Sequence, residues 1–170
     1  MSVVALVGNP RSGSRTLAVA EAAAEAVGHR IGAAGPYESV DLSALGPVDG
    51  PSPAVVAAMD QVRRASVLVV ASPTYKGTYT GLLKSFVDRL PPDALAGRVA
   101  LPLLVMGDAK HSLAVEVHLR PLLVELGATV PTPGLAVLES QIPRVAEVLA
   151  EWADRVAPQV AAVLREEARG

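Results

Sequence analysis

The chain has 170 residues, of which 51% are hydrophobic, and a formal net charge of −2. We expect one domain over residues 1–170, because this length and apolar fraction suffice for one core. The charge argues against general attraction to nucleic acid, and the absence of cysteine excludes disulfides, thiol catalysis and cysteine-ligated clusters. With no apolar run near the ~18 residues of a membrane span and no leader-like N-terminus, we expect a cytoplasmic protein without a membrane partner.

Apolar strand patterns alternate with helical patterns along the chain. Strands are expected at residues 3–7, 39–41, 67–71, 99–105 and 129–137. Helices are expected at residues 16–27, 53–65, 80–90, 111–126 and 143–165, with Pro158 kinking or breaking the last one. This alternation predicts an α/β protein with a five-stranded parallel sheet covered on both faces. It suits a doubly wound sheet of order 2-1-3-4-5.

The loop between the first strand and the first helix is the most informative stretch, residues 8–16, with the letters GNPRSGSRT. Free backbone N–H groups and the positive end of a helix dipole converge at such a position and favour phosphate. Ser12, Ser14 and Thr16 add hydroxyl groups, and Arg11 and Arg15 add positive charge. A simple helix N-cap is the alternative interpretation.

Two familiar phosphate motifs do not fit this loop. A P-loop requires lysine where Ser14 stands, and the dinucleotide fingerprint requires glycine where Pro10 stands. Hydroxyl groups without an acidic residue suit a single terminal phosphomonoester, as in a mononucleotide.

A second loop, residues 72–79, follows the third strand and is expected beside the first loop at the switch point of the sheet. It contains two of the three tyrosines, Tyr75 and Tyr79. An exposed tyrosine can stack on a flat ring, Gly77 permits close backbone approach, and Lys76 can offset the charge of a reduced ring. The alternative is a plain turn whose tyrosines pack on the loop itself.

Together, these loops resemble the NADPH-dependent FMN reductases, and most closely the small FMN reductases of two-component sulfonate monooxygenase systems. Residues 8–16 resemble the family's G-S-P-R-x-x-S-R-[ST] phosphate loop. Residues 71–84 resemble its [AT]-[ST]-P-x-Y-x-x-[ST]-[FYI]-[ST]-G-x-L-K signature, and residues 111–123 and 140–142 resemble the sulfonate-type enzymes. The likeness covers residues 3–142 and implies a flavodoxin-like three-layer sandwich.

Carried over by position, the resemblance implies a flavin site with no catalytic acid or base. The histidines His29, His111 and His118 are not spaced as metal ligands, so we expect no metal site. The first loop would hold the FMN phosphate, the second would line the isoalloxazine, and the loop after the fourth strand would touch the ring. The implied cofactor-binding residues are Asn9, Arg11, Ser14, Arg15, Thr16, Pro73, Thr74, Tyr75, Lys76 and Gly107.

The sequence departs from the family pattern in the third loop, which usually carries two glycines and a small residue. Here it reads Met106-Gly107-Asp108. We expect Met106 to narrow the loop and Asp108 to add negative charge beside the flavin edge. Some sulfonate-type reductases carry an inserted tyrosine that makes a π-bulge at a subunit interface, and His118 is the nearest matching position.

By this resemblance the chain is an NAD(P)H-dependent FMN reductase that uses FMN and NADPH. It would supply reduced FMN to a partner flavin-dependent monooxygenase and form a homodimer or homotetramer. The alternative activity is that of an FMN-retaining quinone or azo reductase. An electron carrier of flavodoxin type is disfavoured by the small net charge, and a regulatory protein with an empty pocket stays open.

Overall fold

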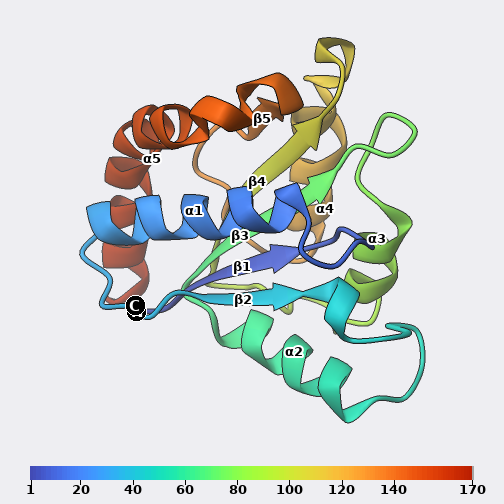
Figure 1. The fold of residues 1–170 in the computed structure, drawn as a ribbon. Helices are drawn as coiled ribbons and strands as arrows, with labels where there is room; N and C mark the ends of the chain where they lie inside the picture. Colours follow the sequence, from blue (N-terminus) through green and yellow to red (C-terminus); the bar gives the residue numbers. More distant parts are fainter. Residues whose placement is uncertain (170) are drawn as a thin grey trace.

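One parallel sheet organises the protein, with its strands in the order β2-β1-β3-β4-β5 (Figure 1). The computed structural model describes residues 1–169. The strands are β1 (Val3–Val7), β2 (Glu38–Asp41), β3 (Val67–Pro73), β4 (Val99–Met106) and β5 (Leu135–Leu138). This flavodoxin-like order confirms the predicted fold class.

Helices cover both faces of the sheet. The α-helices are α1 (Arg15–Arg30), α2 (Pro53–Arg64), α3 (Gly81–Val87), α4 (Arg120–Glu125) and α5 (Val145–Glu167). The short helical turns are η1 (Leu42–Ala44), η2 (Ala109–His111), η3 (Val115–Leu119) and η4 (Glu139–Arg144). Helices α1 and α5 pack on one face, and α2, α3 and α4 on the other.

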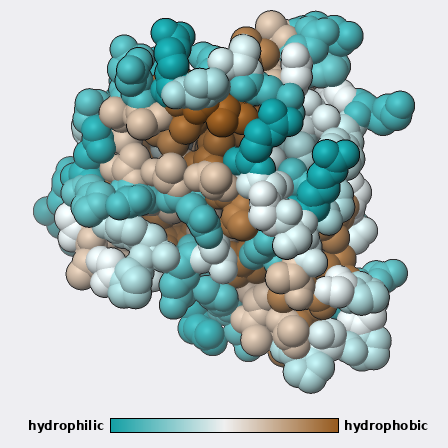
Figure 2. Space-filling model, in the orientation of Figure 1, coloured by the Kyte–Doolittle hydropathy of each residue, from teal (hydrophilic) through white to brown (hydrophobic). Residues whose placement is uncertain are grey.

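The alternation of side chains along each strand builds two cores. Val3, Ala5 and Val7 of β1 face α1 and α5, while Val4 and Leu6 pack in the opposite layer. Strands buried on both faces therefore read as unbroken apolar runs. The edge strand β2 has little apolar character because only one of its residues is buried. In the view of Figure 2, hydrophobic residues show in the upper centre and toward the lower right, and hydrophilic residues surround much of the outline.

Two differences from the expected elements lie at prolines. The strand expected at 129–137 is wrong in its first half: Thr129 makes only an isolated bridge to Val99, and β5 begins at Leu135. Pro131 and Pro133 lie between them and lack the N–H that a ladder requires. The break considered at Pro158 is absent, because α5 continues through it, although its ribbon changes direction along its course in Figure 1.

The helix expected at 111–126 is three pieces. The short turn η2 is followed by η3, which is π-helical and contains His118, and then by α4. The sequence left open whether His118 lies in a π-bulge, and the structure places it in one. The helix expected at 80–90 is also shorter, because Thr80 caps α3 and the helix ends at Val87.

An ion pair holds the π-helical turn against the chain that leads into β5. The Arg120 Nε donates to a Glu116 carboxylate oxygen at 2.5 Å, and its guanidinium also donates to the carbonyls of Val130 (2.9 Å) and Thr132. The other Glu116 oxygen accepts the backbone N–H of Gly134. The Arg120 hydrogen bond is the main cause that lowers the pKa of Glu116 below its ordinary value of 4.5, with Gly134 adding to it.

We expect Glu116→Gln to destabilise the protein by about 1 kcal/mol near neutral pH, since the pair is partly exposed. A carboxylate with a lowered folded-state pKa stabilises the protein above its unfolded pKa, and this stabilisation is lost as pH falls through the folded pKa. The stability gap between the wild type and the variant, measured by urea unfolding, should therefore shrink below pH 4.5. Glu125→Gln is the control. A gap that keeps its size in acid would contradict the role of the pair.

Within residues 1–169, no helix combines the length and apolarity that crossing a membrane requires.

Candidate functional site

The carboxyl ends of the strands define one edge of the sheet (Figure 1). At this edge the loops after β1, β3 and β5 border a common pocket. Its volume is about 280 Å³. Its lining comprises Asn9, Arg11, Ser12, Gly13, Ser14, Arg15, Thr16, Pro73, Tyr75, Val105 and Glu139. The two predicted loops thus meet in space, as the switch-point argument requires. Of the predicted residues, Thr74, Lys76 and Gly107 are not part of the lining.

Side chains of the first loop brace it from within. The Asn9 side chain donates to the Thr16 hydroxyl at 3.0 Å, and its oxygen accepts the Arg11 N–H at 2.9 Å. The Ser14 hydroxyl caps α1 by accepting the Leu17 N–H at 3.1 Å. Asn9 and Thr16 are buried, so both shape the loop whatever else they bind.

Bracing leaves a run of backbone donors free. Within residues 1–169, no group accepts the backbone N–H groups of residues 12–16. Gly13 has a φ of +61°, and a Cβ added to it would meet no atom within 4 Å. Free N–H groups at the start of α1, together with the helix dipole, form a site for an anion. The predicted phosphate loop therefore has more donors than a helix cap uses, and a terminal phosphate fits it.

The second loop is a tight turn with one exposed ring. Tyr75 and Thr78 pair through their backbones, with Tyr75 N–H donating to the Thr78 carbonyl at 2.9 Å. Lys76 and Gly77 between them have φ values of +53° and +84°, as in a type I′ turn. The Tyr75 side chain is 43% exposed, whereas Tyr79 packs against the core. A plain turn with both tyrosines packed is therefore wrong for Tyr75, whose ring is accessible for stacking.

A buried hydroxyl network ties the two loops together. The Thr80 hydroxyl donates to the Gly8 carbonyl at 2.5 Å and accepts the Leu83 N–H at 3.2 Å. The Thr80 N–H in turn donates to the Ser72 hydroxyl at 3.0 Å. Gly8 itself lies so close to Leu83 that an added Cβ would come within 2.5 Å of the Leu83 Cβ. The ends of β1 and β3 are thus locked to the first turn of α3.

The third loop differs from the expectation in one respect. Met106 ends β4 with its side chain packed in the core, so it does not narrow the loop. Gly107 and Asp108 are exposed. Hydrogen bonding from the Lys110 backbone and then from its ammonium group, at 3.1 Å, lowers the pKa of Asp108. The negative charge expected here is present, with Lys110 as its direct counter-charge.

Glu139 is a lining residue that the sequence analysis missed. It is the first residue after β5 and begins η4. Its carboxylate Oε1 lies 3.0 Å from the Arg15 Nη2. The available signal was its position, because residues that follow the carboxyl ends of parallel strands gather at one edge.

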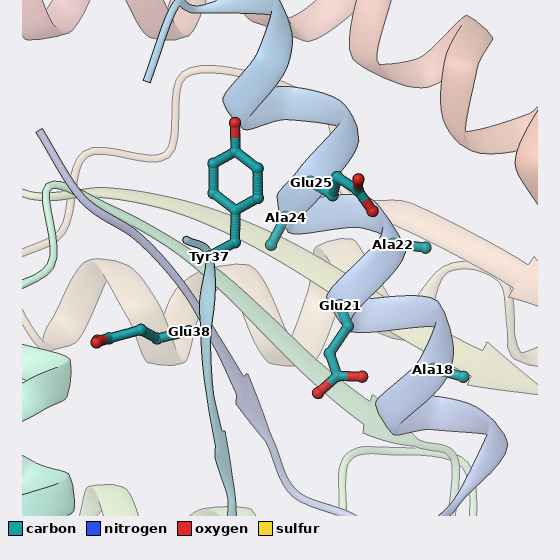
Figure 3. Close-up of a pocket in the computed structure, with 7 residues that line it drawn as sticks. All are labelled: Ala18, Glu21, Ala22, Ala24, Glu25, Tyr37 and Glu38. Atoms are coloured by element: carbon teal, nitrogen blue, oxygen red, sulfur yellow. The ribbon is translucent and has the colours of Figure 1, made fainter. Parts of the chain in front are cut away.

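A different hollow, between α1 and β2, collects three carboxylates, Glu21, Glu25 and Glu38 (Figure 3). Figure 3 shows that these carboxylates diverge, and each has a separate partner. Glu21 accepts from Ser39 (2.7 Å), Glu38 accepts from Gln61 (2.9 Å), and Glu25 lies 3.4 Å from His29. Among the described residues, no three potential metal ligands gather in one place.

A doubly wound sheet with an anion-binding loop at its switch point places the protein in the flavodoxin-like class. The chain belongs to the family of NADPH-dependent FMN reductases, whose family model matches residues 1–143. The chain is 36% identical over 147 residues to an FMN reductase (NADPH) of Escherichia coli strain K12, covering 84% of this chain and 75% of the relative. It is 35% identical over 133 residues to the NADH-dependent FMN reductase SfnF of Pseudomonas fluorescens, covering 72% and 68%.

A solved structure agrees with these relatives. The apo form of the NADH:FMN oxidoreductase EmoB superposes with a TM-score of 0.82 at 34% identity, covering 92% of this chain and 88% of that one. The family resemblance seen in the two loops is confirmed. The protein is therefore an oxidoreductase of a family whose cofactor and nucleotide are FMN and NADPH.

Proposed function

We propose that this protein transfers a hydride from NAD(P)H to FMN and releases reduced FMN to a partner flavin-dependent monooxygenase. The observation that carries the proposal is the row of backbone N–H groups at residues 12–16, which have no acceptor within residues 1–169, in a pocket that Arg11, Arg15 and the exposed Tyr75 also line. When bound, FMN supplies the hydride acceptor, its N5 atom. The nicotinamide C4 is the donor.

In this proposal the protein binds and orients. The first loop holds the phosphate through its backbone N–H groups, Ser14 and the side chains of Arg11 and Arg15. Charge-assisted hydrogen bonds are therefore concentrated at the phosphate end of the site. Pro73, Thr74, Tyr75 and Lys76 support the ring, and Gly107 approaches it from the third loop. Stacking of nicotinamide on the other ring face would supply the near-contact geometry. No side chain has to exchange a proton in the hydride step.

An open site favours flavin as a substrate that leaves. Tyr75 is 43% exposed, and the Arg15 side chain is 63% exposed. Ligands enclosed by protein lose most of their contact with water, whereas these residues are open to solvent. The likeness of residues 111–123 and 140–142 to sulfonate-type reductases supports a monooxygenase as the recipient.

The same segment supports a homodimer or homotetramer. Leu113, Val117 and Val124 are 69%, 57% and 55% exposed. Leu113 lies in the turn before η3, Val117 in η3 beside His118, and Val124 in α4. Exposed apolar side chains grouped in this way fit a subunit contact. Light scattering would give the oligomeric state directly.

The proposed function is tested by steady-state oxidation of NADPH and NADH, with and without added FMN, after a visible spectrum of the purified protein. We expect colourless protein whose turnover appears only with FMN. Yellow protein that reduces quinones without added flavin would establish the FMN-retaining alternative instead. Absence of FMN-dependent oxidation with both nucleotides would reject the proposal.

A further inference from the structure

Glu139 introduces a negative charge into the pocket that the proposed function assigns to the FMN phosphate, and the following inference rests on that function. Among the residues that line the pocket, Glu139 alone carries a carboxylate. Its Oε1 lies 3.0 Å from the Arg15 Nη2, so the pair occupies one side of the phosphate cradle.

We propose that Glu139 competes with the flavin phosphate for Arg15, and so weakens FMN binding and speeds its release. An ionised carboxylate is only an acceptor, so Glu139 offers the phosphate no hydrogen bond. A phosphate that engages Arg15 must displace the Glu139 oxygen or share the guanidinium with it. In both cases the phosphate experiences repulsion from a second anion within the same hollow.

The backbone keeps this carboxylate at the pocket. Glu139 directly follows β5, and the Leu138 N–H before it donates to the Gln141 side-chain oxygen at 2.8 Å. The turn of η4 is therefore closed by its own side chain, and Glu139 projects from a fixed position. Its removal does not disturb that closure, because neither partner of the closing bond is Glu139.

Because the Arg15–Glu139 ion pair is exposed, Arg15 can exchange Glu139 for a phosphate. The side chains of Arg15 and Glu139 are 63% and 46% exposed, and exposed ion pairs contribute little net stability. A phosphate with bidentate access to guanidinium forms the stronger contact. The FMN phosphate can therefore displace Glu139 from Arg15, and the competition still lowers the affinity for FMN.

The chain provides a matched control at the other end of α1. Arg30 pairs with Asp154 of α5 at 2.5 Å, and both pairs join α1 to the C-terminal part of the chain. Neither Arg30 nor Asp154 lines the pocket. Asp154→Asn therefore removes a similar ion pair without changing the charge of the site.

The experiment measures dissociation constants for FMN and riboflavin by flavin fluorescence, in the wild type, Glu139→Gln and Asp154→Asn. We expect Glu139→Gln to bind FMN about twofold to fivefold more tightly, the range of one exposed charge contact. Riboflavin lacks the phosphate, so its affinity should not change. Stopped-flow dissociation of FMN should slow by a similar factor, and Asp154→Asn should match the wild type.

A double variant tests whether the effect passes through Arg15. The compared quantity is the change that Glu139→Gln causes in the logarithm of the FMN dissociation constant. In an Arg15→Gln background this change should be less than half of that in the wild-type background. Unchanged or weaker FMN binding by Glu139→Gln alone would overturn the inference, since Glu139 would then be neutral or would position Arg15. Equal gains for FMN and riboflavin would also overturn it. Wild-type protein that binds riboflavin and FMN equally would instead reject the phosphate site on which the proposed function rests.

Discussion

Arg11→Ala should weaken FMN binding by about tenfold to one hundredfold and leave riboflavin binding within about twofold of the wild type. Each hydrogen bond to a charged group contributes about 1.5–3 kcal/mol, and about 1.4 kcal/mol corresponds to tenfold in affinity. Arg11 is exposed and lines the pocket, and its side chain forms no ion pair within residues 1–169. Its loss should therefore affect the ligand and not the fold.

Flavin fluorescence titration at low and at high salt measures this effect. The gap between the wild type and Arg11→Ala should narrow as salt screens the phosphate contact. Arg64→Ala, at the exposed end of α2, removes the same charge at a distance and is the control. Loss of riboflavin affinity equal to the loss of FMN affinity would place Arg11 at the ring instead of the phosphate. If Arg64→Ala weakened FMN binding as much as Arg11→Ala does, the loss would reflect the total charge of the protein and not a contact between Arg11 and the phosphate.

Thr80→Val should destabilise the protein by about 2–4 kcal/mol. The substitution keeps the shape of the side chain but removes the donor to the Gly8 carbonyl and the acceptor for the Leu83 N–H. Each buried polar group left without a partner costs about 1–3 kcal/mol, and the loss of a helix N-cap by itself costs about 0.5–2 kcal/mol. Because Thr80 is 2% exposed, water has little access to replace either bond.

Urea unfolding followed by circular dichroism gives the free energy of unfolding. The midpoint should fall without a change in slope, since the extent of the folded core is unchanged. Thr80→Ser retains the hydroxyl and should lose less than about 1 kcal/mol. If Thr80→Val unfolds at the same midpoint as Thr80→Ser, the hydroxyl network is not what locks the two loops together.

The two ends of the site differ in how they are built. The phosphate end consists of backbone donors held by Asn9, Thr16 and the buried Thr80 network, so it is preformed before any ligand arrives. The ring end is an exposed turn carrying Tyr75. In the proposed function, a preformed phosphate site would give selectivity for FMN over riboflavin at low ordering cost. An exposed ring end would leave the flavin accessible to a nicotinamide and free to leave.

Several features of the protein were readable from local sequence. The apolar runs of β1, β3 and β4 predicted a buried parallel sheet, because strands covered on both faces need apolar side chains at every position. Hydroxyl groups and arginines in residues 8–16 predicted the anion loop, since the donors and the charges lie within a few residues of one another. The second loop was found for the same reason.

Other features depended on contacts between distant segments. Glu139 enters the pocket only because β5 ends at the same sheet edge as β1, and it pairs with a residue 124 positions away. Asn9 and Thr16 were expected to contact FMN directly, but whether their polar atoms are free depends on how the loop closes on itself.

The sequence by itself determined the alternation of buried strands with helices and the positions of the two loops, because these follow from short-range patterns of apolar, hydroxyl and glycine residues. The family was indicated by the resemblance of the two loop motifs to those of the FMN reductases. Only the tertiary structure decided that Met106 points into the core, that α5 continues through Pro158 and that Glu139 faces Arg15. The physical reason is that a side chain's direction and partners are set by packing between elements, which no local periodicity records.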